Sequence, residues 1–286
     1  MKRIYVLLFV LFTTSMNAQR DFSDVEITSE KLTDGVYAIF GAGGNIGLAI
    51  GKDAAYLVDD QFAPLTDKIV AHVKTLTDKP IHYVLNTHLH GDHSGGNENL
   101  AKAGALIFAH DNVRKRMESA EEPKPKKALP VVTFNDKMTL HLGNGKRIRA
   151  LHVDPAHTDG DTYYYFPEDN VIHMGDNFFA GRYPYIDLDS GGDIDGLIAN
   201  VTMALGMVDE ATQIIPGHGA VSSKANLESY HNILVTLRDR VKKAREEGKS
   251  LEEVQKMGLS KEWDATHGQG FINADKIVEF IYKSAD

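Results

Sequence analysis

Short apolar runs separated by turn residues indicate β-strands along much of the chain. Strands are expected at residues 35–40, 46–50, 54–58, 81–85, 105–109, 131–134, 138–142, 147–153, 162–166, 171–174 and 213–215. The run at 81–85 is apolar and β-branched at its start, which is typical of a strand buried in a sheet. The glycine-rich stretch 41–45 joins two strands, so it predicts a hairpin loop, able to act as a flap, rather than a phosphate-binding loop.

Other stretches place apolar residues three and four positions apart, which predicts helices. The longest, 223–247, has Leu227, Leu234 and Val241 on one face. Helices are also expected at 65–76, 96–103, 111–120, 197–205, 251–257 and 274–282. The charged, proline-rich stretch 121–127 predicts a surface linker. Strands and helices alternate in two successive halves, which favours sheets in the middle of the molecule with helices outside.

The first 18 residues have the three-part pattern of a secretory signal peptide. A basic start precedes an unbroken apolar run at 4–12, and small polar residues lead to an expected cleavage point after Ala18. The apolar run is too short for a membrane span, which needs about 20 residues. We therefore expect a periplasmic or secreted protein in which residues 19–286 form a single domain that ends in helices from about 223.

Charge and cysteine content narrow the classes of function. The formal net charge is −9, which argues against a nucleic-acid partner. The chain contains no cysteine, so an exported domain of this size must be stable through its core alone. Any metal must then be held by nitrogen and oxygen donors. We expect a small-molecule substrate and predict no protein partner and no stable membrane insertion.

The loop at 86–97 carries the densest group of reactive side chains. Its metal-ligating residues are His88, His90, Asp92 and His93, which fall within six positions after an expected strand. The first two lie two positions apart, so they project to the same side of an extended backbone, and Gly91 then turns the chain. Imidazole is the commonest metal ligand, and this arrangement suits two adjacent ions better than one.

Three further donors follow later strands, and they are His157, Asp176 and His218. His218 stands between two glycines, where packing does not explain a histidine. The ends of strands in stacked sheets can converge on one edge, so these donors are expected to complete the two metal sites.

The H-x-H-x-D-H loop, followed in order by these three donors, resembles the ligand series of the metallo-β-lactamase superfamily. The resemblance runs from about residue 32 to residue 220. It implies a four-layer αββα sandwich, in which two mixed β-sheets are flanked by helices and share one metal edge.

By position, the resemblance implies one zinc ion on His88, His90 and His157, a second on Asp92, His93 and His218, and Asp176 as the bridge. A hydroxide between the ions would be the nucleophile, since bound zinc lowers the pKa of water to about 7. Asp92 would orient this hydroxide as the catalytic residue. Asp59, Asp159 and Asp161 are expected to fix ligand histidines through hydrogen bonds. Iron and manganese also accept such ligands, but diiron relatives usually have a glutamate at the position of His90, which favours zinc.

The stretch after Asp176 is rich in aromatic residues. We expect a substrate wall formed by Phe178, Phe179, Arg182 and Tyr183, the alternative being that the rings belong to the core. A bridging aspartate is typical of relatives that cleave thioesters, lactones and phosphodiesters, whereas zinc β-lactamases commonly have another residue there.

The leading hypothesis is an exported dizinc hydrolase that attacks an ester, lactone or β-lactam-type carbonyl. The main alternative is a glyoxalase II-like thioesterase, although export separates it from that enzyme's usual cytosolic substrates. A phosphodiesterase fits the acidic charge less well. The sequence also leaves open a metal-binding or redox module without hydrolysis and a zinc-stabilised structural domain. In a structural zinc site, however, protein ligands fill every coordination position, whereas seven donors shared by two ions leave a position open for water.

Overall fold

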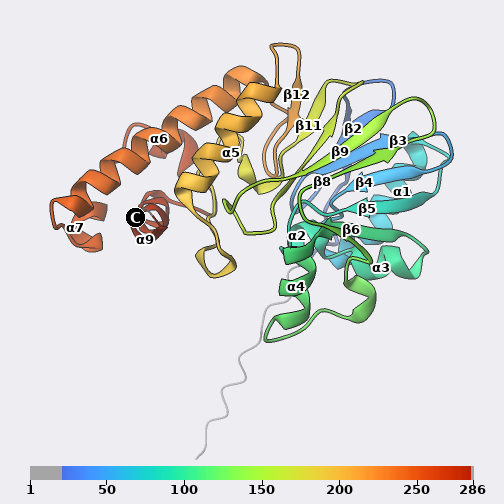
Figure 1. The fold of residues 1–286 in the computed structure, drawn as a ribbon, viewed down its shortest axis with the longest axis horizontal. Helices are drawn as coiled ribbons and strands as arrows, with labels where there is room; N and C mark the ends of the chain where they lie inside the picture. The colour runs from blue at the N-terminus through green and yellow to red at the C-terminus, as the bar shows by residue number, and fades with distance from the viewer. Residues whose placement is uncertain (1–20, 285–286) are drawn as a thin grey trace, which may run out of the picture.

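A computed structural model describes residues 21–284, and two packed β-sheets lie together on the right in Figure 1. The first sheet holds seven strands in the order β1 to β7. They are β1 Thr28–Lys31, β2 Val36–Phe40, β3 Ile46–Ile50, β4 Ala55–Val58, β5 Ile81–Leu85, β6 Leu106–His110 and β7 Val132–Phe134. The second sheet has the order β12-β11-β10-β9-β8. Its strands are β8 Lys137–His141, β9 Arg147–His152, β10 Thr162–Phe166, β11 Val171–His173 and β12 Gln213–Ile215.

Both sheets are mixed, as predicted. In the first, the pairs from β1 to β4 are antiparallel, and the pairs from β4 to β7 are parallel. In the second, β11 and β12 are parallel and the other pairs are antiparallel. Parallel neighbours need a crossover, and the helix α1 (Thr66–Leu76) supplies one between β4 and β5. The carboxyl ends of β4, β5 and β6 therefore lie along one edge.

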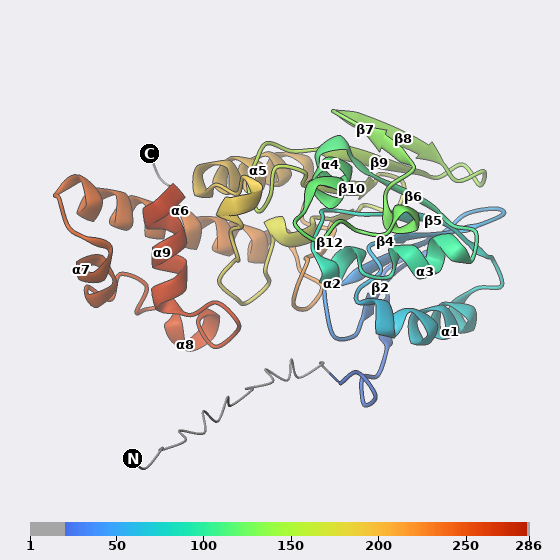
Figure 2. The ribbon, with the colours of Figure 1, turned by 90° about the horizontal axis from the view of Figure 1, so that it is seen from below.

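Helices cover the outer face of each sheet (Figure 2). The helices beside the first sheet are α1, α3 (Asn97–Lys102) and α4 (Asp111–Ser119), while α5 (Ile194–Met207) and α6 (Lys224–Glu246) cover the second. One apolar cluster joins Leu57 to Ile69 beneath α1, and another joins Ile172 to Leu197 beneath α5. A third cluster fills the space between the sheets. These four layers confirm the αββα sandwich.

The C-terminal helices α6, α7 (Leu251–Lys256), α8 (Asp264–His267) and α9 (Ala274–Ser284) extend beyond the sheets (Figure 1). The Ser223 hydroxyl and the Asn226 side chain form a capping box that starts α6. The helices α5, α7 and α9 all pack on α6. The expectation of a single domain over 19–286 stays a prediction.

The pattern missed elements that are short or polar. The strand β1 is largely exposed at the sheet edge, so it shows no apolar alternation. The helix α2 (Gly91–Ser94) is a single turn. The 3₁₀ turns η1 (Ala63–Leu65), η2 (Lys126–Ala128), η3 (Gly175–Asn177) and η4 (Leu188–Ser190) were not predicted either. The end of the expected linker 121–127 runs into η2.

The expected signal peptide, residues 1–18, lies outside the described residues, so export stays a prediction. Between residues 21 and 284, no helix combines the length and the apolar character needed to cross a membrane.

Candidate metal centre

The loop rich in histidines follows β5 at the carboxyl edge of the first sheet. Asn86 fixes its start, because its N–H donates to the carbonyl of Phe108 (2.9 Å) and its carbonyl accepts the Tyr164 hydroxyl (3.0 Å). The single turn of α2 then reverses the chain after His90. This turn explains how six consecutive residues reach two different groups of donors.

The loops that follow β9, β11 and β12 bring three more donors to this edge. His157 lies between β9 and β10, Asp176 lies in η3 after β11, and His218 follows β12. The ligand atoms form two groups, and within each group they lie within 4.8 Å of one another. The groups are His88, His90, His157 and Asp176, and Asp92, His93 and His218. The structure thus brings together all seven predicted ligands.

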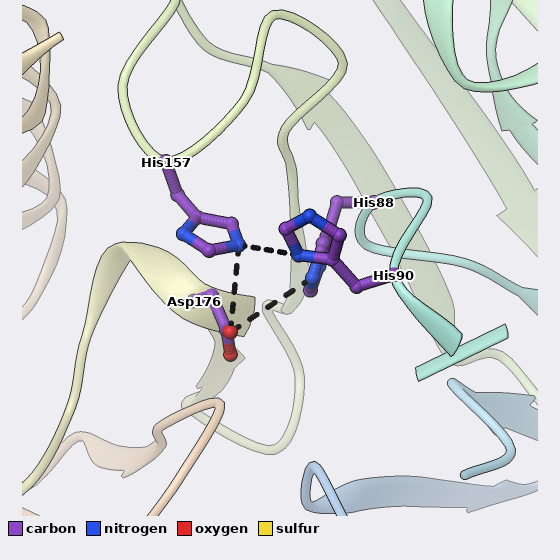
Figure 3. Close-up of side chains that lie close together, drawn as sticks. All are labelled: His88, His90, His157 and Asp176. Carbon is purple, nitrogen blue, oxygen red and sulfur yellow. Dashed lines mark hydrogen bonds and ion pairs between the residues drawn. The ribbon is translucent and has the colours of Figure 1, made fainter. Parts of the chain in front are cut away.

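The first group is centred on one carboxylate oxygen of Asp176 (Figure 3). Nε2 of His157 lies 3.5 Å and Nε2 of His88 lies 3.8 Å from Asp176 Oδ2. Nε2 of His157 also lies 2.9 Å from Nδ1 of His90. Three ring nitrogens therefore point toward a common space beside Asp176.

The second group lies against the other oxygen of the same carboxylate. Asp176 Oδ1 is 3.1 Å from Nε2 of His93 and 3.4 Å from Nε2 of His218. Nε2 of His218 lies 3.4 Å from Asp92 Oδ2. Asp176 therefore presents one oxygen to each group, which is the arrangement required of a bridging ligand.

The donor set fits a pair of divalent ions. His88 Nε2 and Asp176 Oδ1 are buried and form no hydrogen bond among residues 21–284, although Asp176 Oδ1 lies close to the imidazoles of His93 and His218. Burying polar atoms without partners is costly, and a cation between the two groups would satisfy both. All seven ligands offer nitrogen or oxygen, a set that zinc accepts and that iron or manganese also tolerates.

Asp59 orients two of these histidines from behind. Its Oδ2 accepts hydrogen bonds from His93 Nδ1 (2.7 Å) and from the Thr87 hydroxyl (2.7 Å), and its Oδ1 accepts the Thr87 N–H (2.7 Å). The Thr87 oxygen lies 2.9 Å from His88 Nδ1. Both imidazoles are thus held with Nε2 toward the centre. Asp59 has a φ of 64°, which is rare for a residue other than glycine. Strained backbone conformations of this kind are often found at functional sites.

Other partners hold the remaining histidines. His90 Nε2 lies 2.8 Å from Asp187 Oδ2, and His157 Nδ1 donates to the carbonyl of Tyr185 (2.8 Å). Asp161 accepts the His157 backbone N–H (2.8 Å), so it fixes that loop rather than the ring. The expectation for Asp159 is wrong, because its carboxylate pairs with Arg116 (2.6 Å).

Sequence reasoning assigned no orienting role to Thr87, Asp187 or the Tyr185 carbonyl. A threonine at the end of a strand is ordinary, and no pattern identifies a backbone acceptor. Asp187 reaches His90 only because the chain folds back over 97 positions.

Burial and mutual charge set the pKa values of the centre. Burial raises the pKa of Asp176, but the nearby imidazoles, foremost His93, outweigh burial and hold it well below its usual range. Burial lowers the pKa of His218, yet the carboxylates of Asp176 and Asp92 raise it overall to about 9. The pKa of Asp187 falls to about 2, because hydrogen bonds from His90 and Ser190 outweigh its burial. Bound cations would replace the protons of the second group.

A cavity of about 1130 Å³ opens over the exposed side of the centre. The ligands that line it are His90, Asp92, Asp176 and His218. Phe179, Arg182 and Tyr183 also line it, where the substrate wall was predicted. The Arg182 side chain has no ion pair within residues 21–284.

Phe178 is a correction to the predicted wall. Its ring is buried and packs on Tyr230, with ring centroids 5.1 Å apart, so it belongs to the core. Phe179, one position later, is also buried but lines the cavity. Phe179 stacks on the imidazole of His218 at 5.2 Å.

The glycine-rich hairpin loop between β2 and β3 closes another side of the cavity. The Gly44 N–H donates to the Asp92 carbonyl (3.0 Å), and the Gln61 amide donates to the Gly44 carbonyl (2.7 Å). A Cβ at Gly44 would overlap the His93 ring. The loop therefore packs directly on a ligand, and two hydrogen bonds hold it there.

Comparison with known proteins identifies the family. The profile of the metallo-beta-lactamase superfamily matches residues 41–220, more than half of the 286-residue chain. The chain belongs to the metallo-beta-lactamase superfamily. The matched range contains all seven candidate ligands and ends shortly before α6.

Two curated relatives are hydroxyacylglutathione hydrolases. The one from Nitrosococcus oceani is 31% identical over 138 residues, which cover 47% of this chain and 47% of that protein. The one from Pelagibacter ubique is 30% identical over 152 residues, which cover 51% of this chain and 56% of that protein. The chain thus spans about half the length of these relatives.

Solved structures share the fold at low identity. A metallo-beta-lactamase from Pontibacter korlensis matches with a TM-score of 0.63 and 17% identity, covering 73% of this chain and 99% of that one. A variant of the sec-alkyl sulfatase PisA1 matches with a TM-score of 0.69 and 15% identity, covering 91% of this chain and 50% of that one. These likenesses show the fold alone.

Proposed function

We propose that this superfamily member is an exported dizinc hydrolase that cleaves the carbonyl bond of an ester, a lactone or a β-lactam-type ring. The observation that carries the proposal is the convergence of seven donors, with Asp176 between two groups, at the floor of a large cavity. Superfamily membership supports hydrolysis as the class of reaction.

Zinc is the proposed metal. His88, His90 and His157 would hold one ion, and Asp92, His93 and His218 the other, with Asp176 between them. Such a pair supplies Lewis acidity, which polarises a substrate carbonyl and lowers the pKa of a coordinated water to about 7.

The chain itself positions the reactants. Asp92 faces the cavity, and its carboxylate would orient the attacking water and accept a hydrogen bond from it. Arg182 lines the same cavity without an ion pair among the described residues, so it can bind an anionic group of the substrate. Phe179 is fixed against His218 and would exclude water from that side.

A thioesterase is the second candidate. The two hydroxyacylglutathione hydrolases support it, as relatives that match about half of each chain. Both candidates require the same metal centre and differ in the group that leaves the carbonyl. Cleavage after Ala18 and a periplasmic or secreted location are part of the proposal and are tested by N-terminal sequencing of the exported protein.

A substrate panel tests the proposal. The mature chain, supplied with zinc, is assayed on a chromogenic β-lactam, a lactone, an oxygen ester, a glutathione thioester and a phosphodiester. We expect hydrolysis of a carbonyl substrate, with loss of at least about 100-fold in kcat/KM for His88→Ala and for Asp176→Ala. Hydrolysis of the phosphodiester alone, or variants as active as the wild type, would contradict it.

A further inference from the structure

Phe271 is the most exposed large apolar side chain among the described residues. It is 90% exposed, whereas the other exposed large apolar side chains range from 42% to 60%. The ring lines the same cavity as the metal centre. It lies outside residues 41–220, so superfamily membership does not account for it.

The segment that carries Phe271 is anchored on both sides. Ile272, the next residue, is 4% exposed and belongs to the core beneath the second sheet. Before it, the Tyr183 N–H donates to the carbonyl of His267 (3.0 Å), and the Tyr183 hydroxyl donates to Asp264 (2.9 Å). The backbone is thus held on both sides while the exposed phenyl ring lines the cavity.

Aromatic rings form a continuous path from the ligands to Phe271. The Tyr185 ring lies 5.8 Å from the ring of His90 and 5.7 Å from the ring of His157. On its other side, its centroid is 6.3 Å from that of Phe271. Tyr185 is itself fixed, because its carbonyl accepts His157 Nδ1–H and its ring packs on Phe280 at 5.3 Å.

We propose that Tyr185 and Phe271 form an aromatic wall that binds an apolar acyl group of the substrate, a medium alkyl chain or an aryl group. The inference rests on the proposed function and deepens it. A carbonyl held between the two ligand groups would direct its acyl chain along Tyr185 toward Phe271. Ala42 and Phe62 line the same cavity, so it offers the chain further apolar surface. Covering the exposed ring supplies the driving force.

The test compares two esters that differ only in the acyl chain. The zinc-supplied mature protein is assayed on p-nitrophenyl acetate and p-nitrophenyl octanoate. For Phe271→Ala, we expect the ratio of kcat/KM for octanoate to that for acetate to fall about tenfold. The ring is exposed, so the variant should fold normally. Met257→Ala, which shortens another exposed apolar side chain of the C-terminal segment, should leave the ratio unchanged. An unchanged ratio in Phe271→Ala would overturn the inference.

Calorimetry separates this inference from the proposed function. Octanoate and acetate are titrated into the wild type and into Phe271→Ala. We expect octanoate to bind the wild type about tenfold more tightly than the variant, with a negative heat-capacity change. If no carbonyl substrate of the panel is hydrolysed but octanoate binds in this manner, the proposed function fails and the aromatic wall stands. Equal binding of octanoate to both proteins would refute the wall.

Discussion

Asp59 is the residue on which the orientation of two ligand histidines depends. It accepts hydrogen bonds from His93 and Thr87, and Thr87 in turn contacts His88. In Asp59→Asn, the amide NH2 would face a donor in either orientation, so at least one of the hydrogen bonds that hold Thr87 and His93 would be lost. We expect zinc affinity to fall about 10-fold to 100-fold, measured by competition with a chromophoric chelator.

Asp78→Asn is the matched control, because the Asp78 side chain is 89% exposed and its carboxylate pairs with Lys79 (3.6 Å). It should bind zinc like the wild type. Equal zinc affinity in Asp59→Asn and the wild type would show that Asp59 does not position the ligands.

For single residues, the sequence shows which side chains belong to the site better than it shows which residues they contact. The seven candidate ligands could be named from the sequence because each is a metal-binding side chain placed after a strand or between glycines. Asp59 was expected to hold a ligand, but its partner His93 was not predicted. Phe178 and Phe179 could not be told apart, since the direction of each ring depends on local backbone angles in a loop.

Among the elements, the β2–β3 loop makes the closest packing against the centre. A methyl group at Gly44 would overlap the His93 ring, and hydrogen bonds to Asp92 and from Gln61 prevent the loop from shifting. We therefore expect Gly44→Ala to lose the second ion, so that zinc content by elemental analysis falls from about two to about one per chain.

Gly91→Ala is the control for that substitution. Gly91 lies between two proposed ligands in the sequence, yet a Cβ there would meet nothing within 4 Å. Its zinc content should match that of the wild type. A full complement of zinc in Gly44→Ala would contradict the packing account.

The start of α4 should respond to pH. His110 accepts the Asn112 N–H at Nδ1 and donates to the Asn135 carbonyl through Nε2. The neutral imidazole therefore satisfies both hydrogen bonds, whereas a protonated Nδ1 could not accept the first. Burial lowers its pKa, and the His152 ring stacked 3.6 Å away lowers it further, against the opposing charges of Asp111 and Asp159.

A lowered pKa in the fold means that the unfolded chain binds the proton more readily. Stabilisation by His110 is therefore complete above its ordinary pKa of about 6.5 and is lost as the pH falls through the lower folded value. We expect His110→Asn, which keeps a capping acceptor, to lose less unfolding free energy than the wild type between pH 7 and pH 5. Denaturant titrations measure this. His141→Asn, at an exposed position, should lose as much unfolding free energy as the wild type over this pH range. The same pH dependence of the unfolding free energy in all three proteins would rule out His110 as a source of acid sensitivity.

The elements themselves were largely predictable because apolar periodicity follows burial. The helix α6 and the buried strand β4 match the expected ranges closely, since each buries a regular set of side chains. The strand β1 and the helix α2 were missed, because an exposed edge strand and a single helical turn leave no periodic signal.

For the whole molecule, function depends on how two sheets and their loops meet. The order of strands places the ends of β5, β9, β11 and β12 at one edge, and the C-terminal segment adds a wall that the ligand motif does not predict. Long-range topology of this kind follows from packing between sheets, which a local pattern does not encode. The expected arrangement of the two sheets came from the resemblance to the superfamily, because apolar periodicity gives only the positions of single strands and helices.

Anomalous diffraction from crystals grown with zinc tests the central claim most directly. We expect two peaks at the zinc edge, one among His88, His90 and His157 and one among Asp92, His93 and His218, with Asp176 between them. A single peak, or peaks away from these side chains, would contradict the account of a dinuclear centre.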